Sequence, residues 1–300
     1  MECDSKRDKP VVVIWSGGFD STYLIAKMLK DHRDVIAITI DHQMTGINRL
    51  VEESQAVKNL TPLLEKLSED CSVNISFHTL TVSNVTNMDN GSLISFDNAY
   101  SDCYGGQIIC QPVFWLCNAL PLLPNGCEIS LSYIAGDRSL SKLSYIENII
   151  ENAAKVMNKS FTVTTPLIYK RKADILFQLR EIDEKFIDIC YSCEYVYRSR
   201  CGGCVPFINV RDALIDLTLK TESLYGNSRY WRGKLAEWFN IDVTVGSSSK
   251  LIKSASVVQN CSMCGTSYES SYADEVPLSK NCSNNITKVF DRRSEHVSDR

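Results

Sequence analysis

The sequence predicts an α/β fold with a doubly wound, mostly parallel sheet, and three observations lead to this prediction. Apolar runs of strand length recur along the chain, as is typical of parallel strands that are buried on both faces. Amphipathic helical patterns separate these runs, which favours repeated strand–helix–strand units. A Gly-Gly turn at residues 16–22 joins the first strand pattern directly to the first helix pattern.

Strand and helix patterns alternate along most of the chain. We expect strands at residues 11–15, 34–41, 73–82, 128–135 and 160–168. We expect helices at residues 23–30, 46–67, 107–120, 146–157, 206–219 and 228–239, and one that begins near residue 170. The stretch from 83 to 106 is rich in Asn, Ser, Asp and Gly, so we interpret it as a long loop, either a functional lid or disordered.

Length and composition indicate one large α/β domain with an appendage. The chain has 300 residues, and we divide it into an α/β domain (1–185), a cysteine-containing segment with helices (186–245) and a Ser- and Asn-rich, loosely ordered tail (246–300). A net charge of −4 disfavours nucleic acid as a partner. The charged N-terminus does not resemble a signal peptide and no apolar run has membrane-spanning length, so we expect a cytoplasmic protein without a membrane partner.

The Gly-Gly turn is the strongest candidate site in the sequence. Its residues are Ser16, Gly17, Gly18, Phe19, Asp20, Ser21 and Thr22. Two glycines allow a ligand to approach the backbone closely, and the N–H groups at the start of the next helix favour an anion. We expect the side chains of Asp20, Ser21 and Thr22 to cap that helix. The turn therefore predicts a phosphate site, and the alternative is a plain Gly-Gly turn before a capped helix.

Three further candidates lie where predicted strands end. Asp41 ends the second strand, and Gly136 and Asp137 follow the fourth. Ligands of open parallel sheets bind beyond the carboxyl ends of the strands, so all three residues should face the same crevice as the Gly-Gly turn. Asp41 is a candidate for binding ribose or a metal ion. The alternative is that it only caps the segment that follows.

Three cations occur together at Lys170, Arg171 and Lys172, at the predicted start of a helix. Cations are unfavourable at a helix N-terminus, so this arrangement requires a compensating anion. Lys170 and Lys172 are therefore candidate catalytic residues, together with Asp20. The alternative is a solvated run of charge.

Cysteines give the strongest indication of a metal. The chain has 13 of them, and Cys190, Cys193, Cys201 and Cys204 form two Cys-x-x-Cys pairs. Four thiolates are the ligand set that tetrahedral zinc prefers, and they leave no open position for catalysis. We therefore expect a structural zinc ion, with a redox thiol pair or core cysteines as alternatives. The sequence does not decide whether there is a second metal site at Cys261, Cys264 and Cys282.

Together, these motifs resemble known families. Ser-Gly-Gly-x-Asp-Ser after a first strand resembles the signature of the PP-loop ATP pyrophosphatases, which split ATP between its α and β phosphates. With the Gly136-Asp137 strand end, the Lys170–Ile175 stretch and the late cysteines, the chain resembles the 7-cyano-7-deazaguanine synthases of the queuosine pathway over about residues 10–215. The resemblance implies a fold like that of the adenine nucleotide alpha hydrolases, with a zinc knuckle.

The same resemblance implies a carbon–nitrogen ligase that uses ATP, Mg²⁺ and Zn²⁺. A 7-deazaguanine carboxylic acid would be adenylated and then passed to ammonia or another amine, with release of AMP and pyrophosphate. The chain departs from the family pattern at Phe207, where the fourth zinc cysteine stands, and Cys190 replaces that cysteine from the other side. The Gln-Arg-His run that usually follows the second strand is reduced to His42-Gln43.

Other functions remain compatible with the sequence. A transfer-RNA thiolation enzyme or a sulfonucleotide enzyme would share the Gly-Gly turn, although the acidic net charge disfavours the first of these. A non-catalytic nucleotide-binding module with a protein partner is a further alternative. The sequence does not decide whether the chain acts alone, as a homodimer or with a protein partner.

Overall fold

A computed structural model describes most of the predicted α/β region. The described residues are 9–43, 49–83, 111–137, 140, 142–192, 205–219, 228–239, 256–260 and 267–271. The predicted loop at 83–106 lies outside them, apart from its first residue. Among these residues, no helix combines the length and the apolar character that crossing a membrane would require.

A five-stranded parallel sheet forms the centre of the fold. The strands are β1 (Val11–Ile14), β2 (Val35–Gln43), β3 (Ile75–Ser83), β4 (Glu128–Ser130) and β5 (Thr162–Thr164), in the order β3-β2-β1-β4-β5. In register, Val11 is paired with Val35 on one side and with Glu128 on the other. The strand order therefore reverses between β1 and β4. A crevice is expected beyond the carboxyl ends of the strands at such a point.

The five predicted strands are confirmed, although β4 and β5 are shorter than expected. Pairing in β5 ends at Thr164, and Pro166 follows two residues later. Proline has no N–H group for the ladder, so it terminates a strand of this kind. After Ser130 the chain leaves the β4 ladder and runs on through Gly136 and Asp137.

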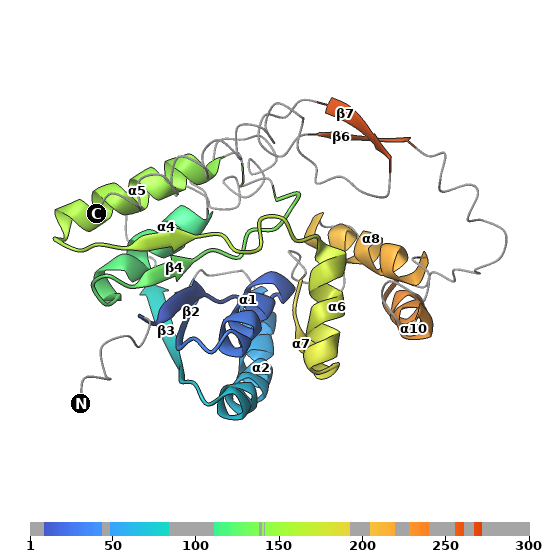
Figure 1. Ribbon diagram of the computed structural model, residues 1–300, viewed down its shortest axis with the longest axis horizontal. Coiled ribbons are helices and arrows are strands. Elements are labelled where there is room, and N and C mark those ends of the chain that lie inside the picture. The colour runs from blue at the N-terminus through green and yellow to red at the C-terminus, as the bar shows by residue number, and fades with distance from the viewer. Residues whose placement is uncertain are drawn as a thin grey trace, which may run out of the picture.

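Helices cover both faces of the sheet (Figure 1). Side chains of β1 alternate between two cores, with Val11 and Val13 in one and Val12 in the other. The first core is shared with α1 (Phe19–Lys30), α2 (Arg49–Cys71), α6 (Lys172–Ile182), α7 (Lys185–Ile189), α8 (Val205–Leu219) and α10 (Ser228–Phe239). The second core is shared with α4 (Gln111–Ala119), the 3-10 helix η1 (Leu120–Leu122) and α5 (Leu143–Val156).

Apolar spacing explains why these segments form helices and how they pack. In α5, the buried residues Ile146, Ile150 and Ala154 recur every four positions, which places them on one face. On the other side of the sheet, α6 lies between α1 and α8, and α10 packs on α8 with Trp231 fully buried. Segments from residue 186 onward therefore contribute to the same core as the first helix.

The C-terminal tail contains more structure than the sequence predicts. Strands β6 (Ser256–Asn260) and β7 (Ser267–Ser271) pair in antiparallel register. The rest of the tail lies outside the described residues, so the expectation that it is loosely ordered stays a prediction. In β6 and β7, Val257, Val258 and Tyr268 are of residue types that favour strands.

Candidate functional site

The Gly-Gly turn lies between β1 and α1, as predicted, and it leaves the helix without a side-chain cap. Gly17 has φ = +73°, a value that glycine adopts without strain. Gly18 is the N-cap residue, and as a glycine it provides no side-chain cap for the first N–H groups of α1. The first helical bond runs from the Thr22 N–H to the Gly18 carbonyl at 3.0 Å. The N-terminus of α1 therefore has the character of an anion site.

The predicted capping roles of Asp20, Ser21 and Thr22 are wrong: Ser21 and Thr22 are buried, and the Asp20 carboxylate accepts from Lys172. The Ser21 side chain is 3% exposed, and its hydroxyl lies 3.4 Å from the Gly18 carbonyl oxygen, to which it donates. Thr22 is fully buried and accepts a hydrogen bond from Trp15 Nε1 at 3.0 Å. Phe19 is also buried, in the core. These side chains shape the turn from inside, whereas Ser16, Gly18 and Asp20 are partly exposed.

Asp20 forms an ion pair with Lys172, the first residue of α6. The Lys172 ammonium donates to both carboxylate oxygens, at 2.6 and 2.5 Å. Both side chains are largely shielded, with exposed fractions of 26% for Asp20 and 13% for Lys172. The prediction that Lys172 faces the Gly-Gly turn is therefore confirmed by the structure.

Asp137 completes a charged cluster with Asp20 and Lys172. Its carboxylate accepts the backbone N–H of Ile134 at 2.8 Å. Burial, and next the negative charge of Asp20, raise the pKa of Asp137 to about 7, while Lys172 acts in the opposite direction. Asp137 is thus close enough to both residues to feel their charge. We call Asp20, Lys172 and Asp137 the charged cluster.

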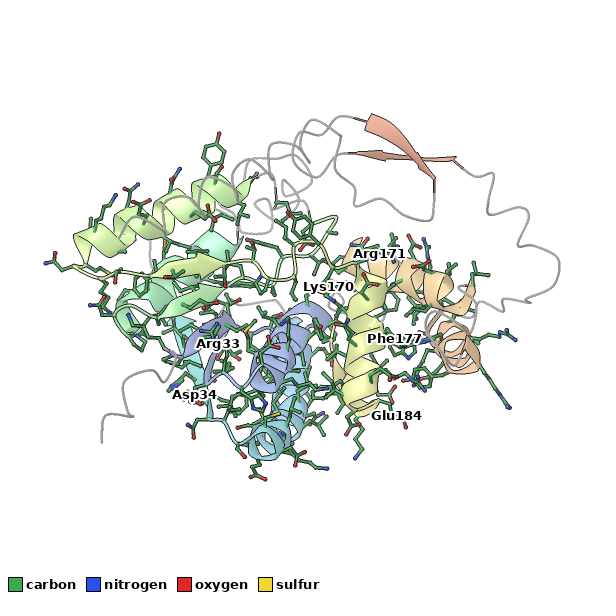
Figure 2. The ribbon with its side chains drawn as sticks, in the orientation of Figure 1. Arg33, Asp34, Lys170, Arg171, Phe177 and Glu184 are labelled. Carbon is green, nitrogen blue, oxygen red and sulfur yellow. The ribbon has the colours of Figure 1, made fainter. Side chains whose placement is uncertain are left out.

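Backbone contacts hold the loop of Asp137 beside the start of α6. The N–H of Ala135 donates to the Lys170 carbonyl at 2.9 Å, and Gly136 next to it has φ = +94°. Figure 2 shows Lys170 and Arg171 together at the N-terminal end of α6. The predicted proximity of the Gly136-Asp137 strand end to the cation run is confirmed.

Carboxylates within the chain supply anions for this cation run. Arg171 lies 3.5 Å from Asp174 through its Nε, and its backbone N–H donates to the same carboxylate at 3.0 Å. Lys172 is paired with Asp20. The unfavourable charges at the helix N-terminus are thus partly compensated from inside the chain, and an external anion is not required to explain them.

A hollow lies beyond the ends of β1 and β2, on the side of β1 that faces away from the charged cluster. It is lined by Ile14, Trp15, Ser16, Thr39, Ile40, Asp41, Glu53, Ser54 and Trp115. Asp41 and Ser16 line it together, so the prediction that Asp41 shares a crevice with the Gly-Gly turn is confirmed. Sequence reasoning missed Glu53 and Ser54 of α2 and Trp115 of α4. No local motif marks these residues, because only the packing of α2 and α4 brings them to the ends of the strands.

The predicted zinc ligands fall mostly outside the described residues. This holds for Cys193, Cys201 and Cys204, and also for Cys261, Cys264 and Cys282. Cys190 is described and follows α7, where burial raises the pKa of its thiol to about 12. Within the described part of the chain, no three His, Cys, Asp or Glu side chains converge as a metal site would require.

Phe207, at the position where the sequence resemblance would lead us to expect a fourth cysteine, belongs to a hydrophobic contact. It is 2% exposed in α8 and stacks on Phe239 of α10, with ring centroids 4.4 Å apart. Tyr191 packs against the same ring. Here an aromatic contact thus stands where the resembled family places a ligand.

No protein-family model matches the chain, and no match is found among curated proteins. The uncapped N-terminus of α1 suits an anion, the hollow offers apolar and polar groups on one side, and the charged cluster offers two carboxylates and an ammonium on the other. The described residues therefore bring an anion-favouring helix N-terminus close to groups of both charges.

Proposed function

We propose that the chain is an ATP-dependent carbon–nitrogen ligase that adenylates a carboxylic acid and releases AMP and pyrophosphate. The observation that carries this proposal is the placement of the Asp20–Lys172 pair beside the Gly-Gly turn, next to Asp137. A hydrolytic site for the terminal phosphate would need a positioned water. A site for transfer at the α phosphate needs a cation close to the turn and room for a second substrate.

Each part of the site has a role in this reaction. The nucleoside would lie in the hollow, with Asp41 as a hydrogen-bond acceptor for the ribose hydroxyls. The phosphates would lie at the N-terminus of α1, held by the backbone N–H groups that follow Gly18. Lys172, and Lys170 near it, would stabilise the negative charge that develops around the α phosphorus.

The reaction itself needs no nucleophile from the protein. A carboxylate oxygen of the substrate attacks the α phosphorus, and the bond from that phosphorus to the bridging oxygen of the β phosphate breaks. Pyrophosphate leaves with the electron pair, and an acyl adenylate remains. Ammonia or another amine then attacks the acyl carbon, loses a proton and displaces AMP. By the sequence resemblance, we propose a 7-deazaguanine carboxylic acid as the substrate.

Mg²⁺ fits the carboxylates of the charged cluster. Asp20 comes from the first turn of α1 and Asp137 from the loop after β4, and the charge of Asp20 contributes to the raised pKa of Asp137. A hard divalent cation favours oxygen ligands and is commonly held by one or two carboxylates together with phosphates. Bound there, it would neutralise charge on the departing pyrophosphate.

We also propose a structural zinc ion, on the basis of the Cys-x-x-Cys spacing. Cys193, Cys201 and Cys204 would be three of its ligands. The fold that accompanies this proposal is a doubly wound sheet like that of the adenine nucleotide alpha hydrolases. It is supported by the strand order β3-β2-β1-β4-β5 and by the helices on both faces.

The sharpest test is exchange of labelled pyrophosphate into ATP in the presence of candidate acids and without an amine. Formation of an acyl adenylate predicts exchange that depends on the acid, and subsequent addition of ammonia should give AMP. Asp20→Ala should abolish the exchange while the protein remains folded. ADP as the product would refute the proposal.

The other functions give different results in the same assay. AMP formation that depends on transfer RNA and a sulfur donor would indicate a thiolation enzyme. ATP binding without any turnover, across all acids and amines tested, would indicate a non-catalytic nucleotide-binding module.

A further inference from the structure

The hollow beyond β1 and β2 has two chemically different walls. Ile14, Ile40 and Trp115 form an apolar wall, and all three pack in the second core of the sheet. Glu53 and Ser54 form a polar wall. They belong to α2, whose apolar residues pack in the first core, on the other face of the sheet. A ligand in the hollow therefore meets apolar groups on one side and a carboxylate and a hydroxyl on the other.

Close contacts fix α2 beside the Gly-Gly turn. A Cβ atom on Gly17 would lie 3.2 Å from atoms of Ala56 and of Val57, while the Gly17 carbonyl accepts the backbone N–H of Tyr191 at 3.0 Å. Glu53 comes three and four residues before the two α2 residues, so it shares their face of the helix, one turn earlier. Because α2 joins the parallel strands β2 and β3, its first turns lie beyond the carboxyl ends of the strands. Glu53 is therefore about 5 Å farther from the sheet than the contact with Gly17.

The hollow is continuous with the turn through Ser16, which belongs to both. The hydroxyl of Ser16 lies 3.3 Å from the place that a Cβ atom on Gly18 would occupy. A nucleotide with its phosphates at the turn would therefore enter the hollow past Ser16. Asp41 belongs to β2, the strand paired with β1, whereas Glu53 and Trp115 come from helices on opposite faces of the sheet. The base, which is farther from the phosphates than the ribose is, would lie between these two helices.

We propose that Glu53 selects a 6-aminopurine nucleotide by accepting a hydrogen bond from the exocyclic amino group, while the base lies against Trp115. An ionised carboxylate only accepts hydrogen bonds, so it favours a base that presents an N–H donor to it. The flat ring suits an aromatic wall. Glu53 is thus a specificity-determining residue and takes no part in transfer at the α phosphorus. The inference rests on the proposed function insofar as the hollow is taken to hold the nucleoside of ATP.

The test removes the two partners of this hydrogen bond separately. One ligand is ATP, and the other is purine riboside 5′-triphosphate, which differs from ATP only in having hydrogen in place of the 6-amino group. The full-length proteins are the wild type, Glu53→Ala, Glu53→Gln and Glu52→Ala. Glu52 is the matched control, because it is the neighbouring carboxylate on α2, is exposed and does not line the hollow. Affinities are measured by calorimetry with Mg²⁺ and without acid or amine, and thermal unfolding shows that each variant is folded.

We expect the wild type to bind ATP about tenfold more tightly than the analogue, as for one hydrogen bond to a charged group. Glu53→Ala should lower the affinity for ATP by about tenfold and that for the analogue by less than about twofold, because the lost bond exists only with ATP. Glu53→Gln should keep a preference of about threefold, since its amide oxygen still accepts but carries no charge. Glu52→Ala should behave as the wild type.

Two results would overturn the inference and leave the proposed ligase standing. The first is an equal loss of affinity for both ligands in Glu53→Ala, which would mean that Glu53 does not contact the amino group. The second is binding of GTP by the wild type at least as tightly as ATP. A preference for ATP that depends on Glu53, without AMP formation from any acid, would uphold the inference while the proposed ligase fails. Failure of the wild type to bind any of these nucleotides would overturn both.

Discussion

Lys172 donates to both carboxylate oxygens of Asp20, at 2.6 and 2.5 Å, although the two residues are 152 positions apart in the sequence. The pair joins the start of α1 to the start of α6, so two helix N-termini meet at one carboxylate and one ammonium. A phosphate that enters beside Asp20 would repel this carboxylate and attract the ammonium. We therefore expect Lys172 to exchange Asp20 for the nucleotide during the reaction.

Lys172→Ala should lower turnover by about 100-fold and change ATP affinity much less, because a cation aimed at developing charge acts mainly in the transition state. Turnover is measured as acid-dependent AMP formation, and affinity by calorimetry. Lys155→Ala is the control, since Lys155 forms an exposed helical pair with Glu151. Lys170→Ala is compared in the same assay. Near-normal turnover in both Lys170→Ala and Lys172→Ala would remove this segment from the site.

Stability without ligands should fall as the pH rises from about 4 to about 7, owing to Asp137. Its pKa is about 7 in the folded protein, above the usual value for an unfolded chain of about 3.9. In that window the folded state therefore holds a proton that the unfolded state has lost, and the free energy of unfolding decreases with pH. Each pKa unit corresponds to about 1.4 kcal/mol. Counting less than the full shift, we expect the free energy of unfolding to fall by on the order of 2 kcal/mol across this pH range.

Urea unfolding at pH 5 and pH 7.5 measures this effect, and Asp137→Asn isolates it from the other carboxylates. The variant should lack this part of the pH dependence, because its side chain can still accept the Ile134 N–H but does not titrate. Mg²⁺ should bind the wild type more tightly above pH 7 than below it. An equal pH dependence in the wild type and the variant would contradict the assignment.

Gly17→Ala should destabilise the protein by about 1 to 3 kcal/mol, because a residue with a side chain is strained at positive φ. The φ of Gly17 is +73°, and the added Cβ would lie 3.2 Å from atoms of Ala56 and Val57. Gly233→Ala is the matched control, since nothing lies within 4 Å of its Cβ position in α10. That substitution should stabilise the protein by about 0.5 to 1 kcal/mol. Thermal unfolding of both variants measures this: the melting temperature should fall in Gly17→Ala and rise in Gly233→Ala.

Asp41→Asn and Trp115→Ala should weaken ATP binding and leave the turnover of bound substrate nearly unchanged. Both residues line the hollow, away from the charged cluster. Loss of one charge-assisted hydrogen bond at Asp41 corresponds to about 10-fold in affinity. Asp70→Asn, at an exposed carboxylate near the end of α2, serves as the control. A fall in turnover at saturating ATP would place the hollow at the reacting group and not at the nucleoside.

The sheet could be predicted from the sequence because its strands are buried on both faces. Continuous apolar runs such as Val11–Ile14 have few other conformations in which all their side chains are buried. Gly17 and Gly18 at a strand-to-helix junction, and Asp41 and Asp137 near strand ends, could be placed for the same reason. The topology brings the carboxyl ends of parallel strands to one edge of the sheet, whatever the sequence between them.

Other parts of the site depend on packing that no local pattern reports. The sequence suggested caps at Ser21 and Thr22 by residue type alone, but both hydroxyls are directed into the interior by their neighbours. Glu53 and Trp115 reach the hollow only because α2 and α4 cross the ends of the strands. The hydrogen bond from the Tyr191 N–H to the Gly17 carbonyl joins two segments that only the folded chain brings together. The spacing of the neighbouring Cys190 from Cys193 suggested only a metal.

The contact of Tyr191 with Gly17 also affects when the site is completed during synthesis. The Gly-Gly turn leaves the ribosome near the start of translation, but its partners on α6, α7 and α8 follow much later. Until then, the N–H groups of α1 face water with neither Lys172 nor Tyr191 beside them. A nascent chain that ends before α6 would therefore contain the whole Gly-Gly motif without Lys172 or Tyr191 beside it, so the site that we propose for the nucleotide is completed only after most of the chain has been synthesised.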